Sequence, residues 1–435
     1  MVKRRLVLAT TLALFGVAAC QLVLGLNKPE EFDPVSDAGD AGRDGGIEGG
    51  IVATCVPSVF PPRPQPDAAS DAAPNMDRLY YMAIRSFSLG SQDNLPGVNL
   101  DCADTCSEAG PAALSCVPRQ GGDICDEPRG VDNQVARIAK NKLFITVDES
   151  LGAQSIQAGK FGEVIVLKNY NGLPDDESVG VGFAPSPGFS GRFGDGDGGL
   201  GCQEIRNSPI PDSGPSCGPP GTSCSSDADG RSNCCGNCND DGGCSPLPQW
   251  NGCDSWILDT GFAVGRNDKG EPLSYIPGYV LDSVLYVLPS DQSRIPLQLG
   301  GTVAVLRAAG LVARVERIDK DGVEVDAGDR AERIRLRGAL VFGRLSPREL
   351  LGFALQTRPC LPFSVVEPFV KDLCKSQDVA LDLTNPGATC DAFSTGFLFD
   401  TESAESGPVG DASVGKPCVV STPDGASVDS LFDCP

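Results

Sequence analysis

The chain has 435 residues and a formal net charge of −23, contains no histidine, and is 40% hydrophobic. The lack of histidine excludes Ser-His-Asp and Cys-His catalysis and histidine metal triads, so any general acid or base is a carboxylate, a tyrosine or a lysine. The acidic balance repels phosphate backbones, and we expect no nucleic-acid partner.

An export signal is predicted at the N-terminus. Basic residues at 3–5 and an apolar run lead to small side chains before Cys20, which is the layout of a signal peptide. Ala18 and Ala19 followed by Cys20 resemble the lipobox of bacterial lipoproteins, in which the cysteine receives a diacylglycerol and the peptide is cut just before it. The resemblance implies a signal peptide over residues 1–19, lipidation of Cys20 and a stable membrane anchor of several acyl chains.

Gln21 stands where many inner-membrane lipoproteins of Gram-negative bacteria carry aspartate, so we expect the outer membrane, with the domain facing the periplasm or the cell surface. Two alternatives stay open: ordinary cleavage that releases a soluble protein, and a membrane span over residues 6–26, a length that crosses a bilayer core of about 30 Å. Cysteine parity favours the lipid, because one lipidated cysteine among 19 leaves 18 for pairing. In an exported chain we expect those cysteines to form disulfides.

Residues 20–75 are predicted to form a disordered acidic tether. This segment is rich in Pro, Gly, Asp and Ala and poor in apolar residues, so it cannot offset the entropy lost on ordering. A flexible chain of about 50 residues spans roughly 40 Å, and the tether therefore holds the following domain away from the membrane.

Residues 76–435 are predicted to form a β-rich domain. Runs of β-branched and aromatic residues bounded by turn residues predict strands at 78–89, 143–147, 163–168, 179–183, 256–264, 278–288, 301–306, 311–318, 322–325, 334–345 and 392–399. Helices are predicted at 132–140, at 347–356 with Ser346 as N-cap and Pro347 at the first position, and at 365–374.

Many short strands with few helices indicate an all-β fold, and we expect a jelly-roll-like β-sandwich with a few decorating helices and a disulfide-rich insertion. An α+β arrangement is the alternative. Four cysteines follow the first predicted strand in a segment rich in Gly and Pro, and we expect them to close local loops; they are Cys102, Cys106, Cys116 and Cys125.

The disulfide-rich insertion covers residues 202–253. It holds eight cysteines, which are Cys202, Cys217, Cys224, Cys234, Cys235, Cys238, Cys244 and Cys253. The cysteine order and the adjacent pair within 217–244 resemble the inhibitor cystine knot, or knottin. That resemblance implies the pairs Cys217–Cys235, Cys224–Cys238 and Cys234–Cys244, with Cys202 and Cys253 closing the base. A loop held by other pairings is an equal alternative, since six cysteines allow many connectivities.

Acidic loops offer candidate calcium ligands. Calcium takes several hard oxygens, and we select Asp195 and Asp197 as the calcium candidates because exported proteins often use this metal. Solvated Asp-Gly turns are the favoured alternative, since no acidic loop completes an EF-hand. We predict no other metal site and no other cofactor.

The carboxylates at 175–177 are candidates for paired hydrolytic acids. Neighbours on a strand point to opposite faces, so a solvated turn is favoured and no catalytic residue is predicted. Trp256, Tyr279 and Tyr286 lie inside predicted strands and are expected to pack in the core. Trp250, in a loop, is expected to be exposed.

Short motifs also resemble a group of myxobacterial-type exported lipoproteins that have a lipobox, an acidic tether and a β-rich domain. Besides those features, the resemblance rests on Gly-Val-Asp-Asn at 130–133, Gly-Arg at 343–344 and Cys-Asp-Ala-Phe-Ser at 390–394. The group has no assigned activity, so the resemblance implies an envelope location and a β-rich exported domain.

These observations together predict a non-enzymatic cell-envelope lipoprotein. Its disulfide-bonded β-domain would bind an unidentified surface or matrix ligand or have a structural role, with Cys20 as the membrane contact. The alternative is a carboxylate-dependent hydrolase of envelope or matrix polysaccharide, which would need two carboxylates about 5 to 10 Å apart in a cleft.

Overall fold

The structure is a computed structural model that describes residues 60–64, 78–90, 95–101, 116–119, 125–126, 130–141, 149–160, 162–192, 236–238, 244–246, 248, 250, 252–259, 275–299, 302–319, 322–326, 328–356, 363–382, 388–410 and 434. The predicted signal peptide, Cys20 and nearly all of the predicted tether lie outside these residues. None of the helices in the described ranges is long and apolar enough to cross a membrane.

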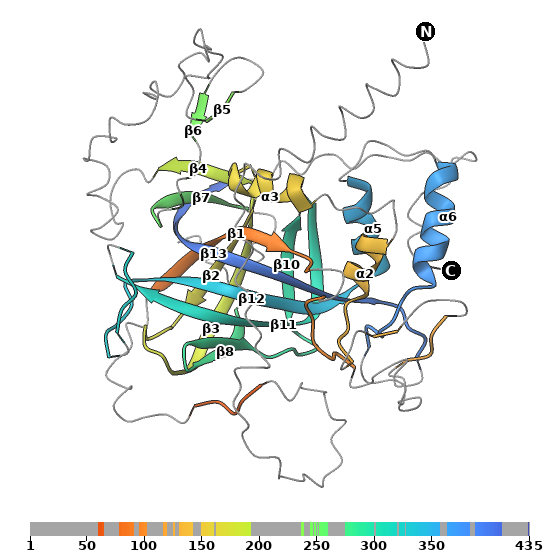
Figure 1. Cartoon of the computed structure of the whole chain (residues 1–435), viewed down its shortest axis with the longest axis horizontal. Helices are drawn as coiled ribbons and strands as arrows, with labels where there is room; N and C mark the ends of the chain where they lie inside the picture. Colours follow the sequence, from red (N-terminus) through yellow and green to blue (C-terminus); the bar gives the residue numbers. More distant parts are fainter. Residues whose placement is uncertain are drawn as a thin grey trace, which may run out of the picture.

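Eight antiparallel strands close into a barrel (Figure 1). In spatial order they are β1 (Leu79–Ser88), β2 (Gly162–Lys168), β3 (Asp176–Ser186), β8 (Ile276–Leu281), β9 (Val284–Val287), β11 (Thr302–Ile318), β12 (Arg333–Leu345) and β13 (Phe393–Gly410). The barrel closes because β13 pairs with β12 through residues 393–399 and with β1 through residues 398–404. Figure 1 shows this junction as the orange β1 beside the blue β13.

The predicted β-sandwich is therefore wrong, although most of the regular structure is β, as an all-β fold requires. Alternating apolar and polar positions identify strands and their buried faces, but they are the same in a sandwich and in a barrel. The two folds differ in whether the first and last strands pair. Here Met82 of β1 lies opposite Ser403 of β13, a pairing across almost three quarters of the chain.

Irregular positions bend the long strands around the barrel. The ladder between β11 and β12 shifts register between Arg307 and Gly310 and again between Val312 and Arg314. At the second shift, β12 contains Gly338 with φ of 51°, a conformation that glycine adopts without a Cβ clash. Extra residues of this kind increase local twist and curvature, which barrel closure requires.

Three further strands extend the sheet beyond the barrel. β10 (Arg294–Leu299) pairs with the first part of β11, β7 (Asp254–Asp259) pairs in parallel with the end of β13, and β4 (Gly188–Arg192) pairs with β7. A separate two-stranded ladder joins β5 (Gly236–Cys238) to β6 (Cys244–Pro246).

Side chains fill the interior of the barrel. Alternate residues of every barrel strand contribute to one buried apolar cluster, among them Met82, Ile165, Val181, Leu285 and Leu336. Two smaller clusters lie on the outside of the wall. One packs Trp256 of β7 against β2, and the other packs Tyr279 of β8 beside Phe342 of β12. The barrel is thus a packed core covered on parts of its outer face.

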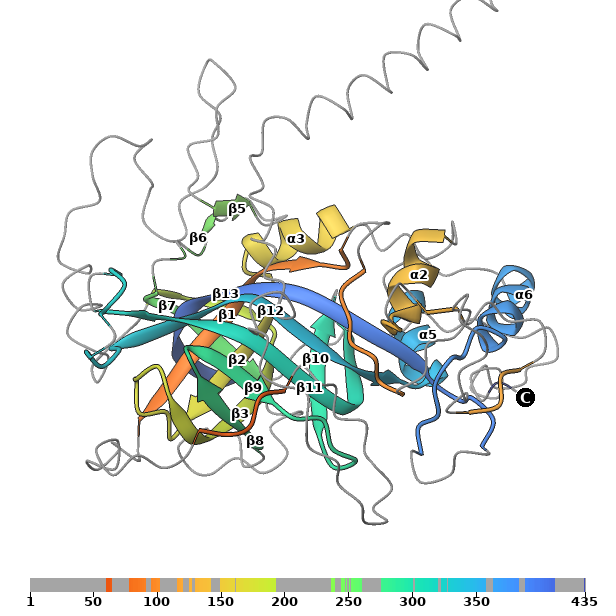
Figure 2. The same cartoon turned by 60° about the horizontal axis from the view of Figure 1, so that its bottom comes forward.

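Among the residues that the structure describes, four helices lie beside the barrel (Figures 1 and 2). They are α2 (Gln134–Asn141), α3 (Glu149–Gln157), α5 (Pro347–Gln356) and α6 (Phe363–Cys374). α3 contacts β1, α2 contacts β13 and α5 contacts β11. The predicted start of α5 is confirmed, because the Glu349 N–H donates to Ser346 Oγ at 3.3 Å while Glu349 Oε2 accepts from the Ser346 N–H at 3.1 Å.

Some element boundaries differ from the predictions. The strands predicted at 301–306 and 311–318 are one strand, β11, which runs from Thr302 to Ile318. Ala308 lies within it at a φ of 46°, so the strand is irregular there but does not end. Helix α3 was not predicted, because its residues show little amphipathic periodicity. The strand predicted at 143–147 lies outside the described residues.

Candidate functional site: a polar cluster beside the Cys116–Cys390 disulfide

Three of the sequence motifs meet beside one disulfide. Arg344, near the end of β12, lies opposite Ser394, near the start of β13, in the antiparallel ladder. Asp132 and Asn133 immediately precede α2, which packs on β13. Asp378, which the sequence did not indicate, reaches the same place from the segment after α6. We call these five residues the polar cluster.

Asp132 and Asn133 hold backbone segments together. The Leu100 N–H donates to Asp132 Oδ2 at 2.6 Å. Asn133 Oδ1 accepts from the Ala136 N–H at 3.1 Å, which makes Asn133 the N-cap of α2. Its Nδ2 donates to the carbonyl oxygens of Gly396, at 3.0 Å, and Pro96. Asparagine serves here because one side chain supplies both an acceptor and two donors.

Ser394 and Asp378 form a closely paired unit. The Ser394 N–H donates to Asp378 Oδ1 at 2.9 Å, and Ser394 Oγ donates to Asp378 Oδ2. Ser394 Oγ also accepts from the Gln134 N–H at 2.9 Å. Burial raises the pKa of the Asp378 carboxyl to about 7, although both hydrogen bonds from Ser394 lower it. Asp378 as a whole residue is partly buried.

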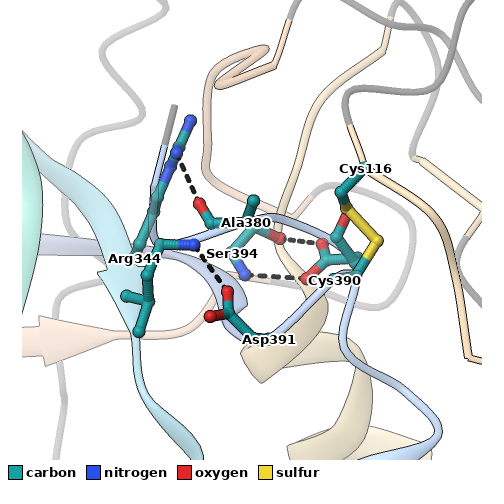
Figure 3. The surroundings of a disulfide bond; sticks show 8 residues. Cys116, Arg344, Ala380, Cys390, Asp391 and Ser394 are labelled. Carbon is teal, nitrogen blue, oxygen red and sulfur yellow. Dashed lines mark hydrogen bonds between the residues drawn. A yellow bond between two sulfur atoms is a disulfide. The ribbon is translucent and has the colours of Figure 1, made fainter. Parts of the chain in front are cut away.

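Arg344 is the buried cation of the polar cluster, with 1% of its surface exposed. Its Nη1 donates to the Ala380 carbonyl at 2.5 Å (Figure 3), and its Nη2 donates to the Leu100 carbonyl at 3.1 Å. Burial lowers the pKa of Arg344, while nearby carboxylates, including those of Asp132 and Asp378, raise it. Burial also raises the pKa of Asp132 well above its ordinary value. The cluster thus places one arginine among several acids in a desolvated region.

The disulfide beside the cluster joins distant parts of the chain. Cys116 and Cys390 are bonded with Cα atoms 5.1 Å apart, and the following Val117 forms a parallel bridge with Thr389. Figure 3 shows the neighbouring Asp391 accepting a backbone hydrogen bond, which comes from the Leu381 N–H at 2.7 Å. The prediction that Cys116 closes a local loop is wrong, since its partner lies 274 residues away. A second disulfide joins Cys374, at the end of α6, to Cys434.

The geometry of the polar cluster favours a structural role over a catalytic one. Asp132 and Asp378 each accept a backbone N–H, the hydroxyl of Ser394 is directed at a carboxylate, and Arg344 donates to two main-chain carbonyls. Buried polar groups that are satisfied in this way rigidify a unique arrangement of loops. The sequence showed the motifs separately, and the register of β12 against β13 together with the packing of α2 on β13 brings them together.

The other predicted site residues fall in different places. Asp195, Asp197, Cys202, Cys217, Cys224, Cys234 and Cys235 lie outside the described residues. Cys238 and Cys244 are opposite each other in the ladder of β5 and β6, and Cys253 is buried and disulfide-bonded. The described part of the chain has no group of three Cys, Asp or Glu side chains arranged to hold a metal ion.

The carboxylates at 175–177 lie at the turn before β3 and at its start. Asp176 Oδ2 accepts from the Asn171 N–H at 2.8 Å, and Asp175 Oδ1 accepts from the Asp282 N–H at 2.8 Å. Burial raises the pKa of Asp176. Asp176 therefore braces its own turn, and Asp175 ties that turn to the turn between β8 and β9.

The predicted aromatic residues are mostly buried, in the two clusters on the outside of the barrel wall. Trp256, Tyr279 and Tyr286 are buried, as their positions within strands predict. The expectation that Trp250 is exposed is wrong, because it packs against Trp256 with ring centroids 5.3 Å apart and is partly buried.

In comparisons with known proteins, no protein-family model, no curated protein and no solved structure matches the chain.

Proposed function

We propose that this protein is a cell-envelope lipoprotein, anchored at Cys20, whose barrel has a binding or structural role that is not catalytic. The observation that carries the proposal is the Cys116–Cys390 disulfide, which lies against a buried polar cluster and joins the segment before α2 to the residues just before β13. Disulfides persist in oxidising compartments, so this bond supports export of the chain.

The packed interior supports a rigid scaffold role. The barrel wall encloses a continuous apolar cluster, and the polar cluster links α2, β12 and β13 through hydrogen bonds to the main chain. Such a domain presents a fixed outer surface. At the end of the acidic tether of residues 20–75, it would meet an unidentified surface or matrix ligand at some distance from the membrane.

Membrane fractionation of variants at the lipobox tests the anchor. We expect the wild-type chain in the outer-membrane fraction and Cys20→Ser in the soluble fraction, since serine cannot receive the lipid. Gln21→Asp is the matched variant: it keeps the lipidation site and is expected to remain membrane-bound while moving toward the inner membrane. A Cys20→Ser chain that stays in the membrane would contradict lipidation as the anchor.

The hydrolase alternative rests on one observation, the raised pKa values of Asp132 and Asp378 within a single cluster. Incubation of the purified protein with envelope and matrix polysaccharides separates the two functions. The lipoprotein proposal predicts binding without release of reducing ends. Release that is lost in Asp378→Asn would instead support the hydrolase.

A further inference from the structure

A small pocket lies between α3 and strands β1, β2, β10, β12 and β13. Its lining combines apolar side chains with two polar residues; it consists of Ile84, Phe87, Ile156, Gly162, Glu163, Leu297, Gln298, Val341, Phe397 and Phe399. The volume that the centre of a water molecule can occupy is about 10 Å³. The surrounding space that is free of protein atoms is about 340 Å³ and includes open solvent. The enclosed part therefore holds a group of about the size of water.

Glu163 is the acidic residue in the lining of this pocket. It lies on β2 and is 2% exposed. Its Oε2 accepts from the Gln298 N–H of β10 at 3.0 Å, while its Oε1 has no hydrogen-bond partner among the described residues. The position of Glu163 follows from the strand alternation, since Ile165 and Leu167 on the same face belong to the barrel core.

Gln298 brings a second acceptor to the same pocket. Its side-chain Oε1 is also buried and also lacks a partner within the described part of the chain. Two buried acceptors without hydrogen bonds in one pocket lower the stability of the fold unless a donor occupies the pocket. The missing component is therefore a group of about water size that donates more than one hydrogen bond.

The carboxylate of Asp259 on β7, near Glu163, favours a cation as that donor. Burial raises the pKa of Glu163 well above its ordinary value and Asp259 raises it further, although the hydrogen bond from the Gln298 N–H lowers it. Without a cation Glu163 is therefore the neutral acid, whereas a cation in contact with Oε1 would stabilise the ionised form. A charge-assisted hydrogen bond from that cation is stronger than a neutral one.

We propose that this pocket binds a primary ammonium group, with the N–H groups donating to Glu163 Oε1 and Gln298 Oε1. A short apolar substituent would lie along Phe87, Phe397 and Leu297 toward solvent. When a neutral amine binds the carboxylic acid, the proton moves from Glu163 to the amine nitrogen; when an ammonium ion binds, that proton is released to solvent. The site is separate from the polar cluster and independent of the lipid anchor.

Isothermal titration calorimetry of the purified full-length protein with methylammonium chloride tests the site. We expect saturable binding of methylammonium and none of tetramethylammonium, which carries the same charge without an N–H. Glu163→Gln keeps an acceptor for the Gln298 N–H but removes the charge, and is expected to weaken binding about tenfold or more. Glu405→Gln, a partly buried carboxyl on β13 outside the pocket, is the matched control and is expected to bind like wild type.

Three results would overturn the proposal: no saturable heat with the wild-type protein, equal binding of tetramethylammonium, or unchanged binding by Glu163→Gln. The first would mean that a water molecule or the proton on Glu163 satisfies the two acceptors. If Glu163→Gln does not fold, the comparison of the two ammonium ions on the wild-type protein still decides.

Discussion

Cys116 and Cys390 are bonded across 274 positions of sequence, and their disulfide borders the site where Arg344, Asp378 and Ser394 meet. The double variant Cys116→Ser/Cys390→Ser is therefore expected to lower the free energy of unfolding by about 2 to 5 kcal/mol, because the unfolded chain regains the freedom that the crosslink removed. Urea denaturation monitored by circular dichroism measures the loss.

The Cys374–Cys434 disulfide provides the comparison. It closes a loop with a sequence separation of 60, so the chain-entropy account predicts a loss about 1 kcal/mol smaller for Cys374→Ser/Cys434→Ser. A Cys116 and Cys390 variant as stable as wild type would show that the polar cluster holds this region without the covalent bond.

Asp378 makes stability depend on pH. Burial raises the pKa of its carboxyl to about 7 in the folded chain, whereas an unfolded aspartate has a pKa of about 4. The folded state therefore binds more protons between these values, and the free energy of unfolding falls as pH rises from about 4 through about 7. Asp378→Asn is expected to flatten this part of the profile in urea denaturation series. Parallel profiles for the two proteins would contradict the raised pKa.

Arg344 is expected to tolerate substitution poorly. Arg344→Met would leave the carbonyls of Ala380 and Leu100 without donors and several acids without their cation, at a cost of about 3 to 5 kcal/mol. Arg314→Met, at an exposed position of β11, is the control and is expected to change stability by about 0.5 kcal/mol or less. Similar melting temperatures for both variants would show that Arg344 is dispensable.

Replacing glycine by alanine is expected to have opposite effects on stability at two positions. A Cβ at Gly396 would clash with the Pro96 carbonyl oxygen, so Gly396→Ala is expected to destabilise the fold by about 1 to 3 kcal/mol. A Cβ at Gly352, inside α5, meets nothing within 4 Å, and Gly352→Ala is expected to stabilise by about 0.5 to 1 kcal/mol. Calorimetric melting of the pair measures both effects, and equal shifts would argue against the close packing of β13 on the segment at Pro96.

Strand positions could be predicted from the sequence, but closure of the barrel could not. Apolar alternation marked 392–399 as a strand, while β13 continues to Gly410 through polar residues that are stabilised by pairing with β1 and β7. The pairing with β1 joins residues more than 300 positions apart and contains a register shift, for which local sequence carries little signal.

The candidate sites were predictable only in part. The motif residues of the polar cluster were visible, yet Asp378 stands in no motif and reaches the cluster through the fold. Glu163 occupies a strand whose two faces are both apolar, Val164 and Val166 on one and Ile165 and Leu167 on the other. Alternation alone could not tell which of these faces the barrel encloses, so the burial of Glu163 gave no signal in the sequence.

The most direct test of the central claim is the intact mass of the protein purified from membranes without reduction, followed by peptide mapping. The account predicts a chain that starts at a diacylated or triacylated Cys20 and contains Cys116–Cys390 and Cys374–Cys434 as bonded peptides. An unmodified N-terminus, or free thiols at Cys116 and Cys390, would contradict the account of an exported, lipid-anchored and disulfide-bonded barrel.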